Sequence, residues 1–157
     1  MSASGSDQIR RAGVEDAADV AQLLHDFNTE YDDPTPPVPV LAERVGELLS
    51  EEAIVVLLAD RPPRGLALLR LKPSLWSQAA DAYLEELYVV PEQRGKGVGK
   101  ALLQAAIDAA REAGADHFEL TTGETDTAAR TLYEGFNLTN CEGGPDGPRM
   151  LYYELDL

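Results

Sequence analysis

The sequence predicts an α+β fold: one domain whose mixed, mainly antiparallel sheet of six to seven strands is flanked by about four helices. Three observations support this prediction. The chain has 157 residues, the usual size of one domain. Apolar runs follow one another in the middle of the chain without a helix between them, and consecutive strands favour antiparallel pairing. Apolar residues at helical spacing recur on both sides of this region.

The N-terminal part is expected to form a strand and two helices. Residues 8–12 are a short strand candidate. Apolar residues at spacings of three and four between Val14 and Phe27 then indicate a helix. The prolines among residues 31–37 cannot continue a helix, so this stretch is a loop. A second helix is expected over residues 40–49.

The middle of the chain is expected to be a three-stranded meander. The continuous apolar run over residues 53–59 is typical of a buried strand. The Pro- and Gly-containing residues 61–65 form a turn, and the next strand covers residues 66–71. The loop over residues 72–80 leads to the third strand, over residues 82–90.

The C-terminal part is expected to alternate helices and strands. A helix over residues 97–113 has a regular apolar stripe and is followed by a strand over residues 117–121. A short helix over residues 125–134 comes next. Two brief strands, over residues 135–139 and 150–155, are expected to close the sheet.

The predicted domain covers residues 8–157, preceded by a disordered tail over residues 1–7. No repeat or interdomain linker divides it. The N-terminus lacks the basic start and apolar core of a secretory signal, and no apolar run approaches the roughly 20 residues of a membrane span. A cytoplasmic location is therefore expected.

Acidic residues outnumber basic ones, 28 to 13, which gives a net charge of −15. Nucleic acids and anionic lipids bind through Lys and Arg, so neither is an expected partner. Such a surface attracts cations such as protonated amines, although a merely solvating surface has the same composition. The single cysteine, Cys141, and the distant pair His25 and His117 predict no metal site.

The clearest chemical signal is a strand that runs through a glycine-rich turn into a helix. Gly95, Gly97 and Gly99 let backbone N–H groups converge, and the helix adds unsatisfied N–H groups and the positive end of its dipole. This combination suits a phosphate or pyrophosphate. The spacing fits neither a Rossmann fingerprint nor a Walker motif, and simple packing of a glycine turn is the alternative.

Three stretches together resemble the GNAT superfamily of N-acetyltransferases. Residues 93–99 match its Gln/Arg-x-x-Gly-x-Gly/Ala loop, and residues 84–89 (Leu-Glu-Glu-Leu-Tyr-Val) are similar to the Leu-Glu-Asp-Leu-Tyr-Val strand of its diamine acetyltransferase branch. Residues 126–134 resemble its Asn-x-x-Ala-x-x-Leu-Tyr-Glu helix. There are two departures. Asp126 replaces an asparagine and cannot donate a hydrogen bond, and Asn137 replaces a glycine but tolerates a left-handed backbone.

The resemblance, which covers nearly the whole chain, implies acetyl-CoA as cosubstrate and no metal. The glycine loop would hold the pyrophosphate, and the preceding strand would pair with the pantetheine like an added strand. The residues implied in cofactor binding are Leu87, Tyr88, Val89, Arg94, Gly95, Lys96, Gly97, Val98, Gly99, Lys100 and Asp126.

An amine acceptor arrives protonated and must lose its proton before it attacks, which requires a base. Glu85 and Glu86 are the nearest carboxylates; residues alternate faces along a strand, so one of them faces the substrate unless a bulge intervenes. Glu85 matches the glutamate of the resembling strand and is favoured, while Glu86 or a water relay stays open. Tyr133 lies where the family places the acid for the leaving thiolate. The acceptor would contact Glu30, Tyr31, Asp32 and Glu86.

The predicted function is acetyl-CoA-dependent N-acetylation of a primary amine, namely a small cationic amine such as a polyamine or diamino compound. A protein N-terminal or lysine acetyltransferase and a non-catalytic CoA-binding sensor are the alternatives. An acceptor with a carboxylate would instead need a basic residue such as Arg70 or Lys72. The expected partner is a small molecule, with no nucleic acid and no membrane, and a homodimer is left open.

Overall fold

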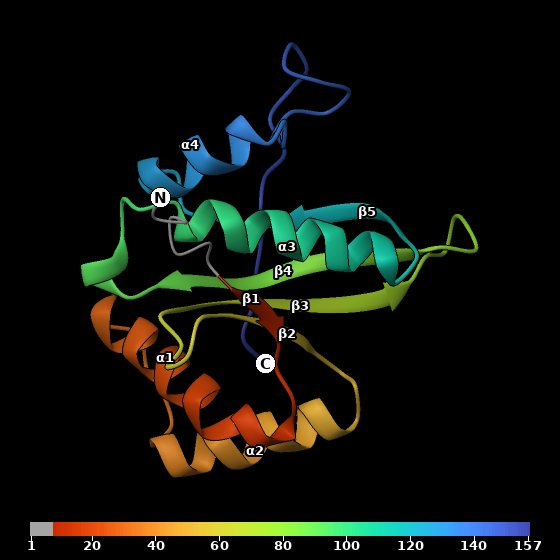
Figure 1. The fold of residues 1–157 in the computed structure, drawn as a ribbon. Coiled ribbons are helices and arrows are strands. Elements are labelled where there is room, and N and C mark those ends of the chain that lie inside the picture. Colours follow the sequence, from red (N-terminus) through yellow and green to blue (C-terminus); the bar gives the residue numbers. More distant parts are fainter. Residues whose placement is uncertain (1–7) are drawn as a thin grey trace, which may run out of the picture. The chain divides into compact units, whose positions relative to one another are not determined.

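The computed structural model describes residues 8–157 and divides the chain into two compact units, of which the first ends at Leu120 (Figure 1). The tail expected over residues 1–7 lies outside the described residues. The first unit contains the sheet, and the second begins at Thr121.

The sheet of the first unit has five strands in the order β1-β2-β3-β4-β5. The first four pair antiparallel, and β5 runs parallel to β4. The mixed, mainly antiparallel α+β fold predicted from the sequence is thus confirmed. The strands are β1 (Ile9–Arg11), β2 (Val55–Ala59), β3 (Gly65–Pro73), β4 (Ala80–Val89) and β5 (Ala115–Leu120).

Helices cover both faces of this sheet (Figure 1). In the first unit, α1 and α2 pack on each other on one face, and α3 lies against β2, β3, β4 and β5 on the other. The helices are α1 (Ala17–Glu30), α2 (Val38–Ser50), α3 (Val98–Glu112) and α4 (Thr127–Gly135), and short 3-10 turns are η1 (Val14–Asp16) and η2 (Pro91–Gln93). The four predicted helices are all present, with ends shifted by a few residues.

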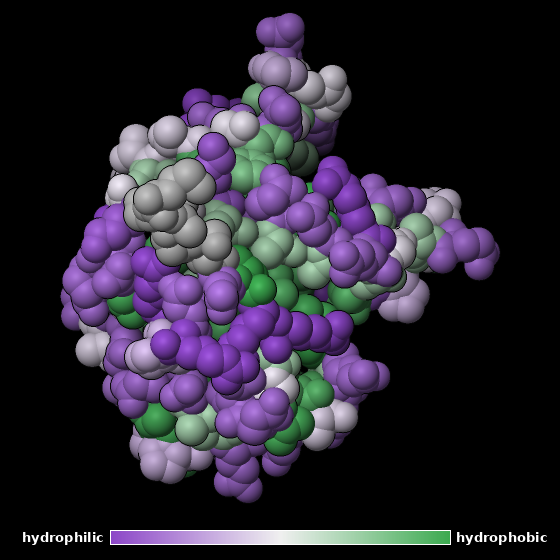
Figure 2. Space-filling model, viewed as in Figure 1, coloured by the Kyte–Doolittle hydropathy of each residue, from purple (hydrophilic) through white to green (hydrophobic). Residues whose placement is uncertain are grey.

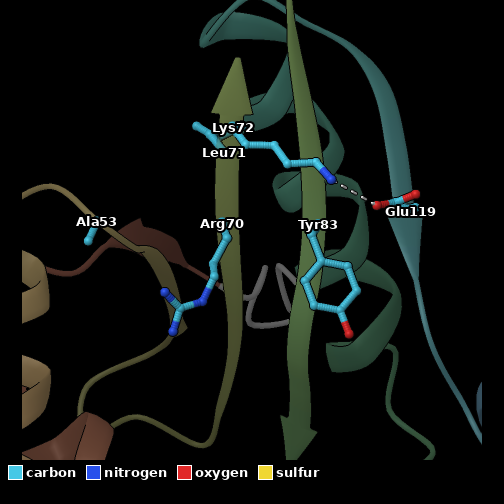
Figure 3. A pocket seen from close by; sticks show the side chains of 6 residues that line it. All are labelled: Ala53, Arg70, Leu71, Lys72, Tyr83 and Glu119. Atoms are coloured by element: carbon cyan, nitrogen blue, oxygen red, sulfur yellow. Dashed lines mark ion pairs between the residues drawn. The ribbon is translucent and has the colours of Figure 1, made fainter. Parts of the chain in front are cut away.

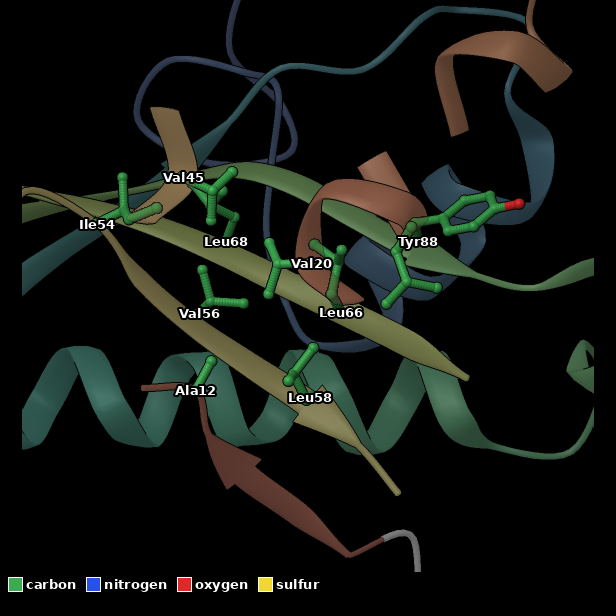
Figure 4. Packing of buried hydrophobic residues seen from close by; sticks show 10 residues of the cluster. Ala12, Val20, Val45, Ile54, Val56, Leu58, Leu66, Leu68 and Tyr88 are labelled. Carbon is green, nitrogen blue, oxygen red and sulfur yellow. The ribbon is translucent and has the colours of Figure 1, made fainter. Parts of the chain in front are cut away.

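Two apolar layers hold the first unit together. Val20 of α1 and Val45 of α2 pack with Leu66, Leu68 and Tyr88 of the sheet in one cluster (Figure 4). On the other face, α3 buries one stripe, made of Val98, Leu102, Leu103, Ala106 and Ala110. A strand between two such layers is apolar on both sides, which explains why every residue of β2 is buried.

The prediction of six to seven strands was wrong, because the last two expected strands do not form. Residues 136–137 are a turn after α4, and residues 138–139 and 150–155 have no regular structure. The only pairing described after α4 is an isolated bridge between Cys141 and Arg149. Tyr153 is 83% exposed. Apolar and aromatic residues give a segment strand propensity, but a strand also requires a hydrogen-bonding neighbour, which local sequence does not encode.

Polar and charged residues dominate the face of the protein seen in Figure 2, in keeping with 26% charged residues in the chain. Among residues 8–157, no helix combines the length and the apolar character that crossing a membrane requires.

Candidate active site

The strand β4 carries a bulge at Glu85. Leu84 lies opposite Leu69 of β3, and Glu86 lies opposite the preceding residue, Leu68, so Glu85 has no partner of its own. A bulge leaves one extra residue unpaired and interrupts the alternation of side chains between the two faces. Such a bulge is the condition under which Glu85 and Glu86 can share one face of the sheet.

Both glutamates lie on the α1/α2 face of the sheet. Glu86 is two residues before Tyr88, which packs in the cluster on that face. The carboxylate of Glu85 forms an ion pair with Arg70, which is two residues beyond Leu68 and therefore on the same face. The bulge thus brings two carboxylates onto one face. Glu85 is paired with a cation, and Glu86 has no ion pair within residues 8–157.

Glu86 has the electrostatics of a proton acceptor. Its side chain is half-buried, and burial raises its pKa to about 7, helped by the negative charges of Glu85 and Asp33. A carboxyl group that titrates near neutral pH can take up a proton and release it again in each turnover. Asp33 lies in the loop after α1, so this loop reaches the surroundings of Glu86.

One edge of β4 is open next to these carboxylates. The parallel pairing with β5 ends at Leu84 and Leu120, and no other described strand pairs with residues 85–89 on that side. This segment includes Leu87, Tyr88 and Val89, which were expected to bind the cosubstrate through their backbone. An open strand edge offers N–H and C=O groups to an extended ligand, as in strand addition by peptides.

The glycine loop ends directly on the N-terminus of α3. Gly95 has a φ of 77° and Gly97 a φ of 85°, which is the left-handed region that favours glycine. The first hydrogen bond of the helix runs from the Ala101 N–H to the Gly97 carbonyl, so the N–H groups before Ala101 have no partner inside the helix. A Cβ atom on either glycine would meet no atom within 4 Å, so there is open space beside the backbone of this loop.

The remaining residues of the loop and of the first turn of α3 include two exposed lysines and one buried valine. Lys96 and Lys100 are exposed beside the N-terminus of α3, whereas the side chain of Val98 is buried beneath it.

Sequence reasoning missed Arg64, in the turn between β2 and β3. Its Nη1 donates to Oε1 of Gln93 at 3.0 Å and so fixes the start of the loop. No local pattern links these residues, because they are 29 positions apart.

The predicted cofactor residue Arg94 and the predicted substrate residue Glu30 are engaged with each other. Nη2 of Arg94 donates to Oε1 of Glu30 at 2.8 Å, and its Nε donates to the carbonyl of Val89 at 2.9 Å. The Tyr88 hydroxyl donates to the same Glu30 oxygen at 3.2 Å, and the Arg94 guanidinium lies 5.6 Å from the Tyr88 ring centroid. The guanidinium of Arg94 holds the pKa of Glu30 below its usual range.

The two other predicted acceptor residues lie at the end of α1. Tyr31 is half-exposed and makes an edge contact with Phe27, with ring centroids 5.4 Å apart. Asp32 adopts a left-handed turn with a φ of 57° and is exposed. Both belong to the segment that brings Asp33 near Glu86.

The second unit holds Asp126 and Tyr133 on α4. The Asp126 carboxylate accepts a hydrogen bond from the Ala129 N–H at 3.2 Å, so it caps the helix. This role suits an aspartate as well as an asparagine. Burial and the negative charge of Asp126 raise the pKa of Tyr133 to about 12, so its hydroxyl stays protonated at neutral pH. Asn137 takes the left-handed conformation, with a φ of 66°, which confirms that it can replace the glycine of the family motif.

The described residues contain no group of three or more His, Cys, Asp or Glu side chains placed to hold a metal ion. The donor set instead consists of backbone N–H groups, exposed lysines and an open strand edge. These are suited to a pyrophosphate and an extended amide chain.

A strand edge left open beyond a parallel strand pair, a glycine loop on a helix N-terminus and an adjacent carboxylate together define an acyl-CoA-dependent transferase. The acetyltransferase (GNAT) family model matches residues 18–137, and the chain belongs to this family. It is an enzyme of a family that uses acetyl-CoA as cosubstrate, which confirms the resemblance seen in the sequence motifs.

Individual relatives agree with this assignment. The uncharacterized N-acetyltransferase YhfO of Bacillus subtilis is 33% identical over 80% of this chain and 85% of its own length. The thialysine N-epsilon-acetyltransferase of Bos taurus is 27% identical over 86% of this chain and 87% of its own. A crystal structure assigned as an acetyltransferase of Arthrobacter sp. FB24 is 47% identical, with a TM-score of 0.87 over 95% of both chains.

Proposed function

We propose that the enzyme transfers an acetyl group from acetyl-CoA to the primary amine of a small cationic molecule, such as a diamino compound or a polyamine. The observation that carries the proposal is the half-buried Glu86, directly after the bulge at Glu85 and at the start of an open strand edge. A base in this position serves an amine that approaches a thioester lying along that edge.

The chain's own groups account for each proton. Glu86 accepts a proton from the acceptor ammonium, and the neutral nitrogen then attacks the thioester carbonyl carbon. A backbone N–H of the open β4 edge stabilises the negative charge on the carbonyl oxygen. The C–N bond forms, the C–S bond breaks, and a hydroxyl proton passes to the leaving thiolate. We assign that last proton to Tyr133, whose raised pKa keeps it protonated at neutral pH. The attacking nitrogen gives up its second proton, which restores the hydroxyl group, and Glu86 releases the first proton to solvent.

The surroundings of Glu86 favour a cationic acceptor. Glu85 and Asp33 are the charges that raise its pKa, so both lie close enough to attract an ammonium group. The whole chain adds a net charge of −15, which steers cations toward it. The name of the Bos taurus relative, a thialysine N-epsilon-acetyltransferase, supports the same choice, since thialysine carries more than one amine.

The proposed function is tested by measuring free-thiol release from acetyl-CoA over a panel of polyamines, diamines, amino acids, aminoglycosides and peptides. We expect acceptor-dependent release with cationic small amines, and acetylated product in equal amount. Preferential release with a peptide N-terminus would contradict the choice of substrate. Tight acetyl-CoA binding without release across the panel would indicate a sensor and contradict catalysis.

Replacing Tyr133 by phenylalanine tests the assigned acid. The ring and its packing are kept and only the proton donor is lost. General acid catalysis typically contributes about 10²–10⁴-fold, so kcat should fall at least about tenfold while acetyl-CoA affinity stays the same. Tyr153→Phe, at an exposed tyrosine of the same unit, is the matched control and should leave kcat unchanged. Wild-type kcat in Tyr133→Phe would show that the thiolate leaves without this hydroxyl.

A further inference from the structure

A pocket that combines apolar and charged lining residues lies on the same face of the sheet as Glu86. It is open to solvent and lined by Ala53, Arg70, Leu71, Lys72, Tyr83 and Glu119 (Figure 3). Tyr83 of β4 lies opposite Arg70 of β3 and opposite Glu119 of β5, so these three residues form a row across three neighbouring strands. Arg70, at the β3 end of this row, is two residues after Leu68, and Leu68 lies opposite Glu86 in the sheet.

The lining of this pocket carries more positive than negative charge, although the chain as a whole is strongly acidic. Lys72 is 65% exposed and reaches Glu119 only at 3.9 Å. Arg70 uses its Nε atom for Glu85, which leaves its two terminal nitrogens for another acceptor. In Figure 3 the guanidinium extends toward the side of the pocket where Ala53 lies, away from Tyr83. The pocket therefore offers a forked donor to an anion without loss of the Arg70–Glu85 contact.

We propose that this pocket binds a carboxylate of the acceptor, so that the substrate is a diamino acid rather than a simple polyamine. The proposal rests on the proposed function, because it takes Glu86 as the place where the reacting amine is held. A guanidinium matches a carboxylate in a two-pronged geometry, and Lys72 adds a second charge at the rim. A diamino acid keeps a net positive charge, so it also satisfies the acids around Glu86.

The spacing along the strands suits such a molecule. Glu86 on β4 and Arg70 on β3 are diagonal neighbours, so their positions are about 7–8 Å apart. A stem of about three to four methylene groups, as in a lysine side chain, can join an amine at one position to a carboxylate near the other. The half-exposed ring of Tyr83 lies in the row with Arg70 and gives this apolar stem a surface to lie on.

The test compares lysine, lysinamide and 1,5-diaminopentane as acceptors. All three present the same reacting amine and stem, but only lysine carries a carboxylate. We expect kcat/KM for lysine to exceed that for the other two by at least about tenfold, which corresponds to about 1.4 kcal/mol. The ratio between lysine and lysinamide is the readout, because a general effect on Glu86 or on folding changes both acceptors alike.

Arg70→Gln should lower kcat/KM for lysine about tenfold and leave lysinamide within about twofold. Lys72→Gln should act in the same direction with a smaller effect. Arg111→Gln, at an exposed arginine near the end of α3, is the matched control and should leave the ratio unchanged. If circular dichroism shows that Arg70→Gln does not fold, Arg70→Lys keeps the charge, loses the fork and should still reduce the ratio.

Equal kcat/KM for lysine and lysinamide in the wild type, or an equal loss of both in Arg70→Gln, would overturn the carboxylate site and leave the acetyltransferase function standing. Absence of transfer to every amine would instead contradict the proposed function. In that case, calorimetric titration with 6-aminohexanoate and with hexylamine still tests whether the pocket binds a carboxylate. Binding of the former alone, lost in Arg70→Gln, supports the site, and equal binding of both overturns it.

Discussion

Replacing Glu86 by glutamine is expected to lower kcat by about 10²–10⁴-fold, the usual contribution of a general base. Glutamine keeps the size of the side chain but cannot accept the proton of the ammonium. Thiol release measured at saturating acetyl-CoA and amine reports the change directly.

The loss of activity in Glu86→Gln should not be caused by unfolding. The raised pKa of Glu86 means that its ionisation opposes folding, so stability falls as pH rises from the unfolded pKa of about 4.5 to the folded value of about 7. Glu86→Gln should therefore be at least as stable as the wild type at pH 8.

The pH dependence identifies which glutamate acts. The base must be ionised, so kcat/KM of the wild type should rise tenfold per pH unit up to about 7, where Glu86 titrates, before a second ionisation from the acceptor amine. Glu86→Gln should remove this rising limb of the pH profile of kcat/KM near pH 7. Glu85→Gln should keep this limb and move it to lower pH, because the charge of Glu85 is one of the causes that raise the pKa of Glu86. Loss of the limb in Glu85→Gln alone would make Glu85 the base, as the family resemblance implied.

Most of the fold could be predicted from the sequence because its signals are local. The apolar spacing of α1 and α3, the prolines after α1 and the continuous apolar run of β2 each report a single element and its burial. The last two strands could not be predicted reliably, because a strand depends on its neighbour. The exposed residues 150–155 have strand-like side chains but no paired strand among the described residues.

The site was predictable where backbone conformation dictates residue type. The left-handed angles of Gly95 and Gly97 favour glycine, so the loop is visible in the sequence. The bulge at Glu85 is not visible, because it arises from the pairing register between β3 and β4. Strict alternation along β4 would have separated the two glutamates. The engagement of Arg94 with Glu30 joins residues 64 positions apart and likewise required the fold.

Replacing Gly97 by leucine is expected to weaken acetyl-CoA binding by about 100-fold. An added Cβ atom meets no atom within 4 Å, so the new side chain has room to extend at the start of α3 and would occupy the place of the pyrophosphate. Charge-assisted hydrogen bonds contribute about 1.5–3 kcal/mol each, so the loss of one or two is sufficient. Isothermal titration calorimetry with acetyl-CoA measures the change.

Gly114→Leu provides the matched control for the backbone. Gly114 follows the other end of α3, has the same φ of 85° as Gly97 and also has no atom within 4 Å of an added Cβ. Both substitutions should cost about 1–2 kcal/mol of stability, because leucine resists the left-handed conformation. Only Gly97→Leu should lose acetyl-CoA affinity. If the two variants bind acetyl-CoA equally well, the glycine loop does not hold the pyrophosphate. If both lose affinity equally, strain in α3 rather than an obstructed anion site is the cause.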